Sequence, residues 1–195
     1  MRAHRPAIGV GAPDVAVAVS DRATDELNVV FNTEVGRAAL AARGVPAPVI
    51  AALADLGLSS ICNVLSAIKT AKRLGLGPDD AIVTVATDGA EMYATEIDKA
   101  IGKRFGGRYD RAAAERALDH HLAGATPDHT LPLAPIDRDR VFNLGYFTWV
   151  EQQGVSVPEF ERRRDQAFWR GLRAALPVWD ALIGEFNAAS GVALA

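Results

Sequence analysis

Apolar residues recur with helical spacing through much of the chain, and the clearest case follows Gly57. Ser59 and Ser60 are candidate N-caps, and the apolar positions behind them fall on one side of a helix. Lysine and arginine side chains occupy the other side and the last turn, where positive charge suits a helix C-terminus. Gly75 ends the pattern. The spacing therefore predicts an amphipathic helix over residues 59–74.

Two short runs of small and β-branched apolar residues predict strands, over residues 15–19 and 81–86. The second run is apolar on both faces, which is typical of a strand inside a parallel sheet. It ends at Thr87 and Asp88, and ligands of α/β proteins bind beyond the carboxyl ends of such strands. The sequence therefore predicts an α/β fold with a ligand site at this strand end.

Most of the remaining chain is predicted to be helical, and the prolines between residues 124 and 135 mark the best linker candidate. Two strands are too few for a stable parallel sheet. We therefore expect that the first part of the parent fold is missing from this chain or that another chain completes the sheet. Helices are expected over residues 21–42, 46–56, 93–105, 110–122, 137–150, 158–175 and 177–187.

This pattern divides the chain into a partial α/β domain, residues 1–109, and a helical C-terminal extension, residues 110–195. The extension is rich in aromatic residues, which at helical spacing form a core or a subunit contact more often than a stacking platform for bases. We expect this tail to wrap the sheet domain or to form a dimer interface. Its aromatic residues are Phe142, Tyr146, Phe147, Trp149, Phe160, Phe168, Trp169, Trp179 and Phe186.

Composition favours a globular, cytoplasmic protein, with 49% hydrophobic and 23% charged residues and a net charge of −3. Basic and acidic residues are interleaved, which disfavours nucleic acid as a partner, and no apolar run is long enough to predict a membrane span. The only cysteine, Cys62, is expected to be a small buried hydrophobe and not a reactive thiol. His120 and His121 are adjacent on a predicted helix, so they point to different faces, and no metal site is expected.

Three segments carry a family resemblance: Gly57-Leu-Ser-Ser60 with the helix behind it, residues 84–93, and residues 142–154. They resemble the C-terminal part of the pyridoxal-phosphate enzymes of the tryptophan synthase β-subunit-like superfamily, fold type II. This superfamily includes cysteine synthases and threonine or serine ammonia-lyases. The resemblance extends over residues 14–190 and implies the C-terminal part of a fold type II parallel sheet with flanking helices.

The resemblance also implies pyridoxal phosphate as cofactor and an amino acid as the substrate of the parent enzyme, in the β-elimination and β-replacement class. The group that contacts the pyridine nitrogen would be Ser59, Ser60 or Thr87, and Asp88 would tune the same pocket. The alternative is that the two serines only cap the helix, while Thr87 and Asp88 only shape a turn.

The family's catalytic lysine, which forms a Schiff base with the cofactor, has no counterpart here. Lys69, Lys72, Lys99 and Lys103 lie on polar faces of predicted helices. A glycine-rich phosphate loop could lie in residues 8–13, although a flexible lead-in is the favoured interpretation. We therefore expect no catalytic residue in this chain and no activity from it alone.

Two functions follow as hypotheses. In the first, the chain is the C-terminal portion of a pyridoxal-phosphate-dependent, lyase-like enzyme and works only with an N-terminal enzyme half. In the second, it is a non-catalytic remnant or interaction module that binds a partner chain, or a second copy, through its aromatic helical tail.

Overall fold

The computed structural model describes residues 13–191 and divides the chain into two compact units. Unit 2 is Val15–Leu131, and unit 1 is Met1–Asp14 together with Pro132–Ala195. The chain passes between them within residues 124–135, the stretch that the prolines indicate as a linker. The glycine-rich candidate at residues 8–13 lies almost wholly outside the described residues.

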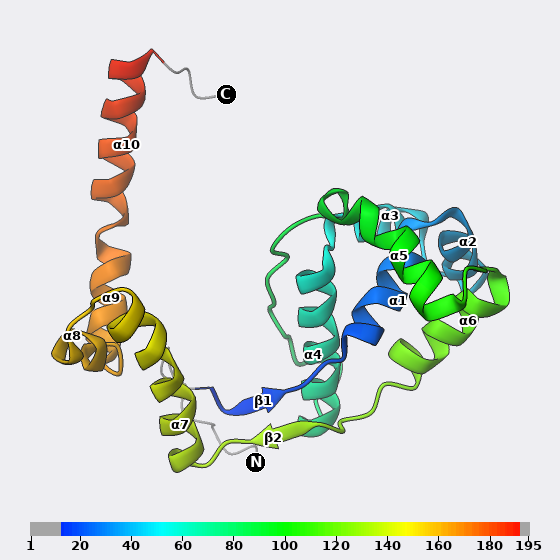
Figure 1. Ribbon diagram of the computed structural model, residues 1–195, viewed down its shortest axis with the longest axis horizontal. Coiled ribbons are helices and arrows are strands. Elements are labelled where there is room, and N and C mark those ends of the chain that lie inside the picture. The colour runs from blue at the N-terminus through cyan, green and yellow to red at the C-terminus, as the bar shows by residue number, and fades with distance from the viewer. Residues whose placement is uncertain (1–12, 192–195) are drawn as a thin grey trace. The chain divides into compact units, whose positions relative to one another are not determined.

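Unit 2 is a cluster of helices around α1 (Figure 1). Leu27, Val29 and Val30 of α1 are fully buried, and α2, α4, α5 and α6 all contact this helix. The core therefore forms around one amphipathic helix. The elements of unit 2 are β1 (Val15–Val17), α1 (Asp21–Asn32), α2 (Glu34–Ala42), α3 (Ala47–Ala52), η1 (Leu53–Asp55), α4 (Leu58–Leu74), η2 (Ala90–Tyr93), α5 (Ala94–Phe105), α6 (Arg111–Leu118) and the π-helical turn η3 (Asp119–Ala123).

The single helix predicted over residues 21–42 is divided in two at Thr33, and that prediction is wrong in this respect. The Thr33 hydroxyl accepts a hydrogen bond from the Gly36 amide (3.2 Å) and donates one to the Val29 carbonyl (2.7 Å). It thus ends α1 and caps α2. Gly36 brings the two helices into close contact, since a Cβ there would lie 2.0 Å from the Val30 carbonyl oxygen.

Helix α4 agrees with the predicted helix to within a residue at its start and ends where the sequence indicates. Gly57 precedes its first turn, and Gly75 ends it in the left-handed conformation, with φ of 62°. Leu65 and Ile61 are buried in the core, while Lys72 and Arg73 lie in the last turn. This helix carries the residues that the sequence proposes as a ligand site.

The predicted α/β fold is wrong, and with it the resemblance to fold type II. The sheet in the described residues has two short antiparallel strands, β1 and β2 (Thr130–Pro132), and no parallel sheet is present there. Residues 81–86 form no strand; they leave the end of α4 and return beside it to η2 (Figure 1). Strand propensity is local, but a strand exists only where a neighbour accepts its hydrogen bonds. Within the described chain this run has none.

Unit 1 is helical over most of its described length. Phe160 is buried among Phe142 and Tyr146, with ring centroids 4.7 and 6.4 Å away. Phe160 and Leu133 are the buried apolar residues among those described in this unit. Its elements are α7 (Pro135–Tyr146), the π-helical turn η4 (Phe147–Gln152), α8 (Val157–Arg162), α9 (Gln166–Ala174) and α10 (Leu176–Ser190).

Among the described helices, none by itself has the length and apolar character needed to cross a bilayer; one sharply bent pair, Ala47–Asp55 with Leu58–Leu74, meets the length and composition criteria jointly.

Candidate functional site

Three of the four residues predicted to contact a cofactor form one hydrogen-bonded network at the start of α4. Ser60, in the first turn, is 1% exposed, and its hydroxyl accepts a hydrogen bond from the Thr87 amide at 2.9 Å. The same oxygen lies 3.3 Å from both Thr87 Oγ1 and the Asp88 carbonyl oxygen. Thr87 Oγ1 in turn donates to Asp88 Oδ1 at 2.8 Å. The turn after residues 81–86 is therefore held against α4.

Tyr93 completes this network, because its hydroxyl donates a hydrogen bond to the Asp88 carboxylate. This bond, with a smaller contribution from Thr87, holds the pKa of Asp88 below its usual value, and it raises the pKa of Tyr93. Gly57 packs directly against the pair: its amide donates to the Asp88 carbonyl at 2.7 Å, and a Cβ there would lie 2.6 Å from Tyr93 Cε2. The side-chain polar groups of Ser60, Thr87, Asp88 and Tyr93 thus all have partners within the network.

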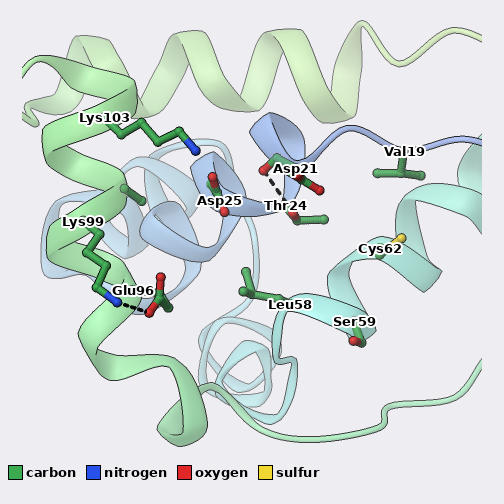
Figure 2. Close-up of a pocket in the computed structure, with 11 residues that line it drawn as sticks. Val19, Asp21, Thr24, Asp25, Leu58, Ser59, Cys62, Glu96, Lys99 and Lys103 are labelled. Carbon is green, nitrogen blue, oxygen red and sulfur yellow. Dashed lines mark hydrogen bonds and ion pairs between the residues drawn. The ribbon is translucent and has the colours of Figure 1, made fainter.

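Ser59 lies apart from the other three residues and lines a cavity of about 450 Å³ between α1, α4 and α5. Figure 2 shows charges of both signs around it, with Lys99 bound to Glu96 at 2.5 Å. Asp25 is held by Arg104 at 2.8 Å, so part of its charge is already compensated. The cavity could hold a small polar molecule of mixed charge. Its lining is Val19, Asp21, Thr24, Asp25, Leu58, Ser59, Cys62, Glu96, Lys99, Ala100 and Lys103.

Of the four predicted residues, Ser59 lines the cavity of about 450 Å³, whereas Ser60, Thr87 and Asp88 do not line it. Ser60 and Thr87 direct their hydroxyls at each other and at Asp88. Neither serine caps α4, since Gly57 is the N-cap and no side chain bonds the first amides. The four residues predicted to contact pyridoxal phosphate therefore do not line this cavity together. Binding of that cofactor stays a prediction, and no chemical step is derived through it.

A buried hydrogen-bonded pair, Glu26 with His121, is the polar feature that sequence reasoning missed. His121 Nε2 lies 2.8 Å from Glu26 Oε2, and both side chains are almost wholly buried. Burial acts to raise the pKa of Glu26, but hydrogen bonds from Arg22 and His121 outweigh it and leave the pKa below its usual value. Burial, together with the nearby charges of His120 and Arg22, lowers the pKa of His121 and outweighs the raising effect of Glu26. A neutral imidazole that donates its Nε2 proton to an ionised carboxylate satisfies both shifts.

The spacing of the neighbouring residues indicates that His121 is buried, although it does not reveal the partner. His121 follows Ala114, Ala117 and Leu118 at helical intervals, and all three are buried in the core. The pair joins α1 to the π-helical turn η3, and His121 also lines a cavity of about 330 Å³. In the described residues, no group of three or more His, Cys, Asp or Glu side chains is arranged to hold a metal ion.

A surface of exposed apolar side chains lies on α9 and α10 of unit 1. Helices α7, α9 and α10 have no buried residue at all, and Phe186 of α10 is 71% exposed. Some aromatic residues do pack: the Arg163 guanidinium lies 4.0 Å from the Trp149 ring and that of Arg164 lies 3.8 Å from the Phe142 ring. The exposed apolar side chains of α9 and α10 are Leu172, Leu176, Val178, Trp179, Leu182, Ile183 and Phe186.

Comparison of the chain with models of protein families, with characterised proteins and with solved structures finds no significant match.

Proposed function

We propose that this protein is a non-catalytic interaction module that associates with a second copy of itself through the apolar face of α10. The observation that supports the proposal is the exposure of six large apolar side chains on one helix of unit 1. Fully burying such a side chain is worth about 1.5–3 kcal/mol. A helix that leaves six of them in water lacks the partner that its sequence requires.

The spacing along α10 favours a helix as that partner. Leu176, Trp179, Ile183 and Phe186 follow one another at intervals of three and four residues, the seam of a helical bundle. Val178 and Leu182 widen this seam, so that large apolar side chains occupy an arc of about 160°. The opposite side carries alanine, glycine, asparagine and the only two charged residues of the helix, Asp180 and Glu185.

The charge distribution permits self-association. Asp180 and Glu185 lie outside the arc of large apolar residues, so two α10 helices can meet without placing the two acidic side chains in the seam. A helix with this pattern buries its apolar side only when another helix covers it. We also propose the cytoplasm as its location, because the chain has one cysteine and so no internal disulfide.

Light scattering on the full chain, over a range of concentrations, tests the proposal. We expect a dimer or higher oligomer that becomes monomeric when Ile183→Asp places a charge in the seam. Ala181→Asp is the matched control, because residue 181 lies opposite the seam on the same helix. It should leave the oligomer intact.

Tryptophan fluorescence gives a second measurement on the same samples. All three tryptophans, Trp149, Trp169 and Trp179, lie in unit 1, so the emission reports on this unit alone. We expect emission at shorter wavelength in the oligomer, and a shift to longer wavelength on dilution or in Ile183→Asp. A monomer at all concentrations with unit 1 folded would contradict the proposal.

A further inference from the structure

Residues 81–86 of unit 2 are a second surface without a partner, and they have the composition of a strand. The run Ala-Ile-Val-Thr-Val-Ala contains no charged residue and four β-branched ones, which favour strands. All six residues are exposed, and Val83 is 94% exposed. An ordinary surface loop is polar and rich in glycine, proline, asparagine or serine. This segment has none of these residues.

The backbone of the segment is also available for pairing. Within the part of the chain that the structure describes, its only hydrogen bond is from Asn63 Nδ2 of α4 to the Val85 carbonyl, at 2.9 Å. A row of unpaired amides and carbonyls is what a sheet edge presents to an added strand. No backbone N–H of residues 81–86 donates to another described residue. The segment can therefore accept a strand without first breaking a sheet.

Both ends of the segment are anchored, which restricts the number of conformations it can adopt. At its start, Gly77 donates its amide to Asp80 Oδ2 at 2.8 Å and closes a turn with Asp80. At its end, the Thr87 amide donates to Ser60, and the Gly57 amide bonds the Asp88 carbonyl. Pairing a segment with fixed ends costs less conformational entropy than pairing a free tail.

The charges at the two ends of the segment select the partner. Asp79 and Asp80 precede it, and Asp88 follows it. Two copies paired in antiparallel fashion, with Val83 opposite Thr84, would place Asp79 opposite Asp88. A parallel, in-register pair would place each aspartate beside its equivalent. Like charges directly across a strand pair are destabilising. Self-pairing in these two registers is therefore disfavoured, and a partner strand with basic ends is favoured in any register.

We propose that residues 81–86 are a docking strand, which pairs through its backbone with an apolar β-strand of another protein that carries lysine or arginine at its ends. The apolar side chains of the two strands then cover one another, and the basic ends neutralise the aspartates. This docking strand lies in unit 2 and does not depend on the α10 seam of unit 1.

A synthetic peptide provides the test, with the sequence Lys-Lys-Val-Thr-Val-Ile-Val-Lys-Lys, capped at both ends and labelled with a fluorophore. Titrating it with the full chain should give saturable binding by fluorescence anisotropy. Hydrogen exchange of amides 82–86 should slow at least about tenfold when the peptide is bound. A peptide with glutamates in place of the lysines should bind at least about tenfold more weakly at low salt.

Three further comparisons distinguish backbone pairing from general stickiness. The same peptide with alternate amides N-methylated has the same side chains but lacks donors, so it should not bind. Thr84→Pro and Val83→Asp in the protein should each abolish binding, the first by removing a donor and the second by adding charge. Val49→Asp, at another exposed valine of unit 2, is the matched control and should bind like the wild type.

Several outcomes would overturn the proposal. Amides 82–86 that already exchange slowly in the unliganded chain would mean that the chain itself covers the segment. Equal binding of the lysine and glutamate peptides, or of the N-methylated one, would rule out the chemistry proposed. Loss of self-association in Thr84→Pro would identify a second copy as the occupant. Failure of the α10 experiment alone would leave these results unaffected, because Ile183 and Val83 lie in different units.

Discussion

Helices α1 and α10 show how the same kind of sequence pattern can lead to opposite outcomes. Both carry large apolar residues at helical spacing. Leu27 of α1 is 0% exposed because α2, α4, α5 and α6 surround it. Leu182 of α10 is mostly exposed, although it has the same side chain and lies in the middle of a longer helix. The apolar face of α1 finds its partners within unit 2, whereas that of α10 has none among the described residues of unit 1, and our proposal is that a second copy supplies it.

The two regions should therefore respond differently to identical changes. Removing buried methyl groups costs free energy of unfolding, because the contacts and the burial of those groups are lost. Removing exposed methyl groups changes the free energy of unfolding very little, unless a partner covers them. Substitutions in unit 2 test its core, and substitutions in unit 1 test its association.

The largest expected effect is that of Leu27→Ala, in the centre of unit 2. We expect it to lower the free energy of unfolding by about 2–5 kcal/mol, because it leaves a cavity among fully buried neighbours. Leu182→Ala, measured at a concentration where the chain is monomeric, should change it by less than about 0.5 kcal/mol. Denaturant unfolding followed by circular dichroism measures both. An equal decrease in the free energy of unfolding in the two variants would mean that α10 is buried by its own chain.

Two glycines give the next comparison, within unit 2 itself. Gly36→Ala places a Cβ 2.0 Å from the Val30 carbonyl oxygen, so α1 and α2 must separate, at a cost of about 1–3 kcal/mol or more. Gly102, inside α5, has nothing within 4 Å of its Cβ position. Gly102→Ala should stabilise the protein by about 0.5–1 kcal/mol, through helix propensity alone. The midpoint temperature of thermal unfolding should fall in Gly36→Ala and rise in Gly102→Ala. An unchanged midpoint in Gly36→Ala would show that the two helices can separate freely.

Local signals in the sequence located most helix ends correctly. Gly57 and Gly75 bound α4, and Asp110 caps α6 by accepting a hydrogen bond from the Ala113 amide. Caps and left-handed glycines involve residues only a few positions apart, so the sequence contains them fully. The breaks at Thr33 and at residues 163–165 were missed, although Thr33 and Asp165 cap the following helices through equally local hydrogen bonds.

Pairing over long sequence separations was not predictable in the same way. Residues 81–86 have strand propensity, but nothing local reveals whether a neighbouring strand exists, and so the parallel sheet was wrongly expected. Ser60, Thr87 and Asp88 do come together, through contacts that span up to 28 positions. The Glu26–His121 pair spans 95 positions and was missed for the same reason.

The Glu26–His121 pair makes the stability of unit 2 depend on pH. Folding lowers the pKa of His121, so the unfolded state binds its proton more readily, and stability falls as pH drops below about 6.5. The lowered pKa of Glu26 adds a further loss at more acidic pH. His121→Gln should cost about 1–3 kcal/mol at pH 7 and flatten the change between about pH 7 and 5. Denaturant unfolding at both pH values measures this change in the free energy of unfolding. If the change is as large in His121→Gln as in the wild type, other groups cause the pH dependence.

The smallest effect concerns the network that holds the end of the docking strand. The hydrogen bond to the Asp88 carboxylate is the main cause of the raised pKa of Tyr93, because ionising the phenol would lose that bond and place two negative charges together. Asp88→Asn removes the charge with little change in shape. We expect one of the three tyrosines to titrate at lower pH in this variant, as measured by the ultraviolet absorbance of tyrosinate. Tyr93→Phe supplies the assignment, since it should remove that transition altogether.

If the transition moves in Asp88→Asn while amides 82–86 exchange at their former rate, the network fixes only the turn. If those amides also exchange faster, the network restricts the docking strand itself, and Asp88→Asn should then weaken peptide binding through lost anchoring as well as lost charge.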